Sequence, residues 1–96
     1  MELQALRTEI DTIDCELVEL FVKRMKVSAQ VAEYKREHGL PVLDATREAA
    51  LLARVADLAG EDLSDYSRAL YETILSLSRD YQGKQLGTDA SMERAQ

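Results

Sequence analysis

Residues 3–38 carry an unbroken helical repeat of apolar side chains. Steps of three and four residues place on one face Leu3, Leu6, Ile10, Ile13, Leu17, Leu20, Val27, Val31 and Tyr34. This pattern predicts one amphipathic helix from near Glu2 to near His38, roughly 55 Å long at about 1.5 Å per residue. Gly39 and Pro41 follow, and both are typical of a helix end. A helix this long cannot bury its apolar face against itself, so other helices must cover it.

One position on this apolar face is occupied by a charged residue, Arg24. A guanidinium group does not lose its charge in a protein, and burying an unpaired charge is energetically costly. Arg24 must therefore face water, pair with an acid inside the protein or bind an anionic ligand. The sequence leaves these three possibilities open.

Two shorter helices are expected downstream. Asp44 is suited to cap the first, which ends at Gly60 and carries on one side Leu51, Leu52, Val55 and Leu58. Ser64 is suited to cap the second, which weakens or ends at Gly83 and presents on one side Leu70, Ile74, Leu77 and Tyr81. We therefore expect an all-α chain of three helices.

The unequal lengths of these helices indicate a dimer. The first helix far outruns the other two, so part of its apolar face stays uncovered within one chain. Two first helices running antiparallel would bury each other's overhang, and we expect an obligate, intertwined homodimer. Residues 1–83 would form this domain. From residue 84 to 96 the apolar content falls, which predicts a frayed or flexible C-terminal tail.

Composition argues against several classes of protein. The net charge of −6 disfavours a nucleic acid partner, and no apolar run reaches the roughly 18 residues of a membrane span. The N-terminus lacks a signal-peptide pattern. Cys15 is the single cysteine, so it has no partner for an internal disulfide. We expect a cytoplasmic protein that binds neither nucleic acid nor membranes.

Three basic residues of the first helix are candidates for ligand binding. Lys35 and Arg24 would lie about 20° apart around the helix and about 16 Å apart along it, close enough for two long side chains to bind one small dianion. Alternatively, Lys35 is a solvated surface lysine. Arg7 would lie about 25 Å from Arg24, too far for a small ligand within one chain. It either pairs with Asp11, one turn away, or lies beside the partner's Arg24 in an antiparallel dimer.

Polar residues of the other two helices complete the candidate set. Ser78 and Gln82 are one turn apart, and they either face inward to bind a polar ligand or are exposed on the last helix. Asp44, Arg47 and Glu48 gather at the start of the second helix, where Asp44 is explained as a cap and the other two could be surface charges. No metal-ligand cluster, nucleophile–base pair or glycine-rich phosphate loop accompanies them. Such a set suits a reaction that needs only positioning and charge stabilisation.

Taken in order, these positions and their apolar neighbours read Leu6-Arg7-x-x-Ile10-Asp11-x-Ile13-Asp14, Leu20-x-x-x-Arg24, Lys35, Val42-x-Asp44-x-x-Arg47-Glu48 and Ile74-x-x-x-Ser78-x-x-x-Gln82. The series resembles the all-helical (AroQ-class) chorismate mutase family, and the resemblance covers about residues 3–83. It implies an isomerase of the shikimate pathway and aromatic amino acid biosynthesis. Members of this family are intertwined homodimers that rearrange chorismate to prephenate without metal or cofactor.

The resemblance also implies a role for each matched position. Arg24 and the partner's Arg7 would hold the two substrate carboxylates, and Lys35 and Gln82 would bind the ether oxygen. Glu48 would accept a hydrogen bond from the ring hydroxyl. The wall around the ring would be formed by the remaining matched positions, Asp44, Arg47, Glu48 and Ser78.

Three alternatives remain open at this stage. An isochorismate pyruvate lyase and a 4-amino-4-deoxychorismate mutase would use the same scaffold, and a carboxylate at Glu48 would also suit an amino-substituted ring. A helical dimerisation module without catalysis would bind no such ligand. Plain chorismate is favoured by Glu48 as hydroxyl partner and by the small side chain of Ser78.

Overall fold

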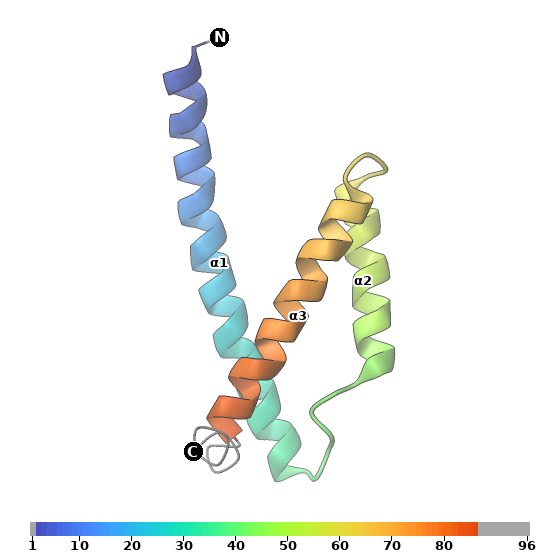
Figure 1. The fold of residues 1–96 in the computed structure, drawn as a ribbon. Coiled ribbons are helices and arrows are strands. Elements are labelled where there is room, and N and C mark those ends of the chain that lie inside the picture. Colours follow the sequence, from blue (N-terminus) through green and yellow to red (C-terminus); the bar gives the residue numbers. More distant parts are fainter. Residues whose placement is uncertain (1, 87–96) are drawn as a thin grey trace, which may run out of the picture.

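The computed structural model describes residues 2–86 and contains three α-helices (Figure 1). They are α1 (Leu3–Glu37), α2 (Ala45–Ala59) and α3 (Ser64–Leu86). No strand occurs among the described residues, so the all-α prediction is confirmed. Of the predicted C-terminal tail, residues 84–86 continue α3, and the rest lies outside the described residues.

Local sequence explains the ends of α1 and α2. Gly39 follows α1 with a φ of +66°, and Gly60 follows α2 with a φ of +84°, both in the region that favours glycine. Asp44 caps α2 as predicted, because its Oδ1 accepts a hydrogen bond from the backbone N–H of Arg47 at 3.0 Å. These stops fix the lengths of the first two helices.

The predicted start of α3 is wrong by one residue, and the helix does not end at Gly83. Ser64 is the first helical residue and not the cap, and its hydroxyl donates to the carbonyl of Glu61 at 3.3 Å. Gly83 does not end the helix, which continues to Leu86. A glycine within a helix is only about 1 kcal/mol worse than alanine. The preceding turn is anchored to α1 by a hydrogen bond from Gln82 to the carbonyl of Ser28, and this anchor favours continuation.

Helix α3 packs against both other helices and organises the fold (Figure 1). It forms a hairpin with α2 through residues 60–63, and its C-terminal half crosses the C-terminal half of α1. Residues 38–44 connect the end of α1 to the start of α2. As a result, the start of α2 and the C-terminal halves of α1 and α3 surround a common space.

The apolar core within one chain is small. Its buried members are Ala32 of α1, Leu51 and Val55 of α2, and Leu75 of α3. The row predicted for α3 is therefore not the row that this chain buries, since Leu70 and Leu77 are 52% and 45% exposed. The reason is geometric: α3 contacts α2 and α1 together, and the residues that make these contacts include Tyr71, Leu75 and Ser78.

The N-terminal half of α1 projects away from the other two helices (Figure 1). Its large apolar side chains are exposed: Leu3, Leu6, Ile10, Ile13, Leu17 and Leu20. The radius of gyration is 16.8 Å, whereas a compact chain of this length would have about 12 Å. No helix among residues 2–86 combines the length and apolarity needed to cross a membrane. Among the described residues, α1 carries most of the exposed large apolar side chains.

Candidate active site

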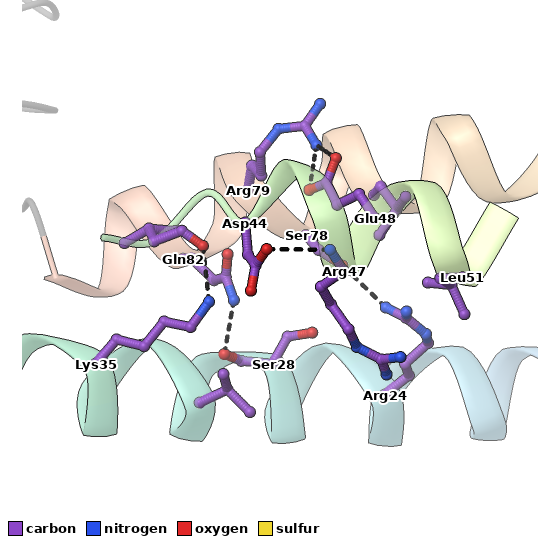
Figure 2. Close-up of a pocket in the computed structure, with 13 residues that line it drawn as sticks. Arg24, Ser28, Lys35, Asp44, Arg47, Glu48, Leu51, Ser78, Arg79 and Gln82 are labelled. Carbon is purple, nitrogen blue, oxygen red and sulfur yellow. Dashed lines mark hydrogen bonds and ion pairs between the residues drawn. The ribbon is translucent and has the colours of Figure 1, made fainter. Parts of the chain in front are cut away.

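A cavity of about 160 Å³ lies between the three helices (Figure 2). It is enclosed by the C-terminal halves of α1 and α3, the start of α2 and the loop before α2. Seven of the eight predicted site residues line it: Arg24, Lys35, Asp44, Arg47, Glu48, Ser78 and Gln82. The remaining lining residues are Ser28, Val31, Val42, Leu51, Leu75 and Arg79.

The cavity is positively charged although the chain as a whole is acidic. Four cations and two acids line it, which gives a net charge of +2 in a chain of net charge −6. Three of the cations, Arg24, Lys35 and Arg47, form no ion pair with any carboxylate in residues 2–86. Like charges gathered in one cavity repel each other, so the arrangement favours binding of an anion.

Arg24 is held in place by neutral groups on α3. Its Nη1 donates to Ser78 Oγ at 3.2 Å, and its guanidinium carbon lies 5.7 Å from the centroid of the Tyr71 ring. Ser78 is buried and Gln82 is half-buried, so these two residues face inward and are not exposed on α3. Three possibilities were open for Arg24. No acid among the described residues pairs with it, and it does not simply face water because it is half-buried at the cavity wall. The geometry therefore favours the anionic ligand.

Lys35 and Gln82 place hydrogen-bond donors at the end of the cavity near the α1–α2 loop (Figure 2). Lys35 Nζ donates to the carbonyl of Val42 at 2.9 Å, and Gln82 Nε2 donates to the carbonyl of Ser28 at 2.9 Å. An ammonium group has three hydrogens and an amide nitrogen has two. Each group therefore keeps at least one hydrogen for a ligand while its contact with the protein fixes its position.

The start of α2 supplies the opposite wall. Glu48 accepts two hydrogen bonds from Arg79, whose Nη1 lies 2.6 Å from each carboxylate oxygen. Asp44 is held by its capping bond to the backbone of Arg47. The Arg47 side chain extends from α2 toward α1 (Figure 2). This wall thus combines a paired carboxylate with an unpaired guanidinium.

Arg7 does not line the cavity. It is exposed in α1, and the same uninterrupted helix separates it from Arg24 by about 25 Å. Its expected alternative partner, Asp11, forms no ion pair with it in the described structure. Within one chain, Arg7 is therefore unpaired and remote from the other candidates.

Two polar contributors were not predicted from the sequence. Ser28 acts through its backbone carbonyl, which no residue pattern can reveal. Arg79 carried a usable signal: Leu75, Ser78, Arg79 and Gln82 follow the i, i+3, i+4, i+7 spacing of one helix face. That face is the one that lines the cavity.

The side chains of the cavity are suited to binding and polarising a ligand. Cys15 is exposed and outside the cavity. The described residues contain no group of three His, Cys, Asp or Glu side chains placed to bind a metal. What the cavity does supply is a positive field, fixed hydrogen-bond donors and two carboxylates, Asp44 and Glu48.

Comparison with known proteins gives matches over part or most of the chain. A T-protein from Haemophilus influenzae is 48% identical over 50 residues, which are 52% of this chain and 13% of that protein. A 4-amino-4-deoxychorismate mutase from Streptomyces venezuelae is 32% identical over 77 residues, which are 78% of this chain and 75% of that protein. A chorismate mutase from Methanocaldococcus jannaschii is 33% identical over 60 residues, 62% of this chain and 61% of that protein.

The chain spans only 13% and 14% of the length of the two T-proteins that it matches. No solved structure matches it. The family model for chorismate mutase type II matches residues 6–83, which include all eight predicted site residues, all of α2 and most of α1 and α3. The match covers most of the chain and the entire cavity, and the chain therefore belongs to the chorismate mutase type II family.

Proposed function

We propose that the chain is a chorismate mutase, which rearranges chorismate to prephenate inside an intertwined homodimer. The observation that carries the proposal is the cavity charge: three cations without an ionic partner in residues 2–86 share a site of net charge +2. Chorismate is a dicarboxylate of matching charge. The family membership of the chain supports the same substrate class.

The first task of such a site is to hold the flexible substrate in its reacting shape. Arg24 would bind one carboxylate, because Ser78 and Tyr71 already fix its guanidinium. Arg47, from the opposite wall, would add a second cation close to the same ligand. Fixing both carboxylates removes most of the rotational freedom of the substrate, and such orientation lowers the barrier of an intramolecular reaction.

The second task is to stabilise charge at the breaking bond. In this Claisen rearrangement a C–O bond lengthens while a C–C bond forms, and negative charge grows on the ether oxygen. Lys35 and Gln82 each keep a hydrogen for that oxygen, and both are fixed by their contacts with backbone carbonyls. Donors fixed before the reaction stabilise the transition state more than the ground state. No covalent intermediate is required.

The ring of the substrate would face the α2 wall. Glu48 accepts hydrogen bonds and would receive one from the ring hydroxyl. Asp44 lies at the same end of α2, and its carboxylate is positioned by the helix cap. The aliphatic lining of the cavity, including Val31 and Leu75, would contact the apolar part of the ring.

A second copy of the chain would complete the site. The exposed apolar face of α1 needs a partner of equal length, and another α1 running antiparallel provides it. In that arrangement the partner subunit's Arg7 would lie beside Arg24 and bind the second carboxylate. Arg7 is exposed and unpaired in the described chain, which supports this role. A cytoplasmic location fits the free, exposed Cys15.

The other activities possible on this scaffold have less support. The family description and the names of several relatives favour a mutase over an isochorismate pyruvate lyase. A dimerisation module without catalysis would not need a cavity that gathers unpaired cations in an acidic chain. The choice between a hydroxyl and an amino group on the ring depends on Glu48 and its surroundings.

The direct test is to incubate the purified chain with chorismate and to separate substrate and product by chromatography. We expect prephenate to form far faster than in buffer, and a bicyclic transition-state analogue to abolish the acceleration. Conversion at the rate seen in buffer, with no binding of the analogue by calorimetry, would overturn the proposed function. That same result would favour the dimerisation module.

A further inference from the structure

Arg79 forms the shortest ion pair described in the chain. Its Nη1 lies 2.6 Å from both carboxylate oxygens of Glu48, and the contact joins α3 to α2 at the cavity wall (Figure 2). The side chains of Arg79 and Glu48 are 40% and 24% exposed, so solvent screens the pair only in part. Both residues line the cavity. Any ligand that reaches Glu48 therefore also meets the charge of Arg79.

The ion pair changes what Glu48 offers to a ligand. A carboxylate has about four lone-pair sites, and Arg79 occupies two of them. Glu48 can still accept a hydrogen bond, but its negative charge is largely balanced by the guanidinium. The group behaves as a hydrogen-bond acceptor with little net charge. The other acid of the cavity, Asp44, is engaged in capping α2.

We propose that Arg79 is a specificity-determining residue, which by pairing with Glu48 makes the site select a neutral ring hydroxyl over a ring ammonium group. This inference rests on the proposed function, because it assigns the substituent of the substrate that Glu48 contacts. A hydroxyl needs only an acceptor, which Glu48 still provides. An alkyl amine is protonated near pH 7, and the resulting ammonium would be repelled by Arg79 and by the positive cavity.

The choice between a ring hydroxyl and a ring amino group is relevant to relatives of this chain. A relative that shares 32% identity over most of both chains is named a 4-amino-4-deoxychorismate mutase, and its named substrate carries an amino group in place of the hydroxyl. Arg79 acts here through Glu48, so its removal should alter the choice of substrate more than the rate with chorismate. That effect distinguishes it from a residue that only stabilises the fold.

The test compares kcat/KM for chorismate and for 4-amino-4-deoxychorismate in the full chain and three variants. In Arg79→Gln we expect the preference for chorismate over the amino substrate to fall about tenfold, from loss of a charge a few ångströms from the ammonium. Arg79→Lys keeps the charge and should retain most of the preference. Arg68→Gln is the matched control: it removes the same charge from an exposed site on α3, about 16 Å from Arg79 along the helix.

Three results would overturn the inference. They are an unchanged preference in Arg79→Gln, an equal change in Arg68→Gln, and a wild-type chain that prefers the amino substrate. Failure of the proposed function looks different, since the wild-type chain would then convert neither compound. In that case calorimetric Kd values for the same two ligands decide the matter: a fall of about tenfold in the affinity ratio in Arg79→Gln supports the inference. An unchanged affinity ratio rejects it.

Discussion

Arg24 and Ser78, 54 positions apart in the sequence, are joined by a hydrogen bond of 3.2 Å between Nη1 and Oγ. The bond links α1 to α3 and directs the Arg24 guanidinium along the cavity wall. Ser78 is 5% exposed and also contacts Met25, with Oγ 3.5 Å from Sδ. A small buried hydroxyl on α3 thus positions Arg24, the cation on α1 that we propose binds a substrate carboxylate.

Replacing Ser78 with alanine should therefore weaken substrate binding. We expect kcat/KM for chorismate to fall about threefold to tenfold and the free energy of unfolding to fall by about 1 kcal/mol, from loss of one hydrogen bond. Ser67→Ala is the matched control, because the Ser67 hydroxyl donates to the carbonyl of Val55 at 2.8 Å, away from the cavity. It should lower stability similarly and leave kcat/KM unchanged. Steady-state kinetics and urea unfolding measure both quantities; equal kinetic effects would contradict the role of Ser78.

Lys35→Ala should reduce kcat by at least about a hundredfold, because a fixed donor to the developing charge is lost. Folding should change little, since the only side-chain hydrogen bond of Lys35 within residues 2–86 is to the carbonyl of Val42 on an exposed loop. Lys26→Ala removes an exposed lysine of the same helix outside the cavity and serves as the control. Turnover near that of the wild type in Lys35→Ala would exclude Lys35 as the donor to the ether oxygen.

Gln82→Glu should make the rate depend on pH. The amide of Gln82 donates a hydrogen at every pH, whereas a glutamate donates only when protonated, below a pKa of about 4.3 in the absence of neighbours. An ionised carboxylate there would also face the carbonyl of Ser28 and the charge growing on the ether oxygen. Activity of the variant should thus be highest in acid and fall as the pH rises. Parallel pH–rate profiles for variant and wild type would rule out Gln82 as a donor.

Ligand binding should stabilise the folded protein, because it neutralises cations that otherwise repel one another. At a prephenate concentration of about 100 times Kd the gain is about 2.7 kcal/mol, which corresponds to a rise in Tm of roughly 10 °C or more for a chain of this size. Thermal melts at fixed protein concentration measure the shift. Arg24→Ala should abolish most of it. A wild-type melt unaffected by saturating prephenate would show that the cavity is not the binding site.

Much of the fold follows from local sequence. The apolar repeat of residues 3–34 predicts α1, and Gly39, Asp44 and Gly60 set the limits of α1 and α2 through backbone conformation and capping. Helix α3 was less predictable, because its boundaries and its buried row depend on contacts with two other helices. The anchoring of Gln82 by α1 is one such contact.

The site was predictable to the extent that charged residues stood out from their surroundings. Arg24 stands out because an arginine on an apolar face needs an explanation, and the motif spacing indicates the other site residues. Arg79 was missed because an arginine next to polar neighbours looks like a surface residue. Its importance depends on the distance to Glu48 across two helices, which only the structure provides.

The central claim is that two chains build each site, with Arg24 from one chain and Arg7 from the other. Arg7→Ala and Arg24→Ala should each be nearly inactive when purified alone. If the two variants are unfolded together and refolded as a mixture, about half of the dimers pair unlike chains, and each of these has one intact site of two. The account predicts recovery of about one quarter of wild-type kcat/KM per chain for chorismate, by this random pairing. A mixture as inactive as its separate components would contradict the shared site.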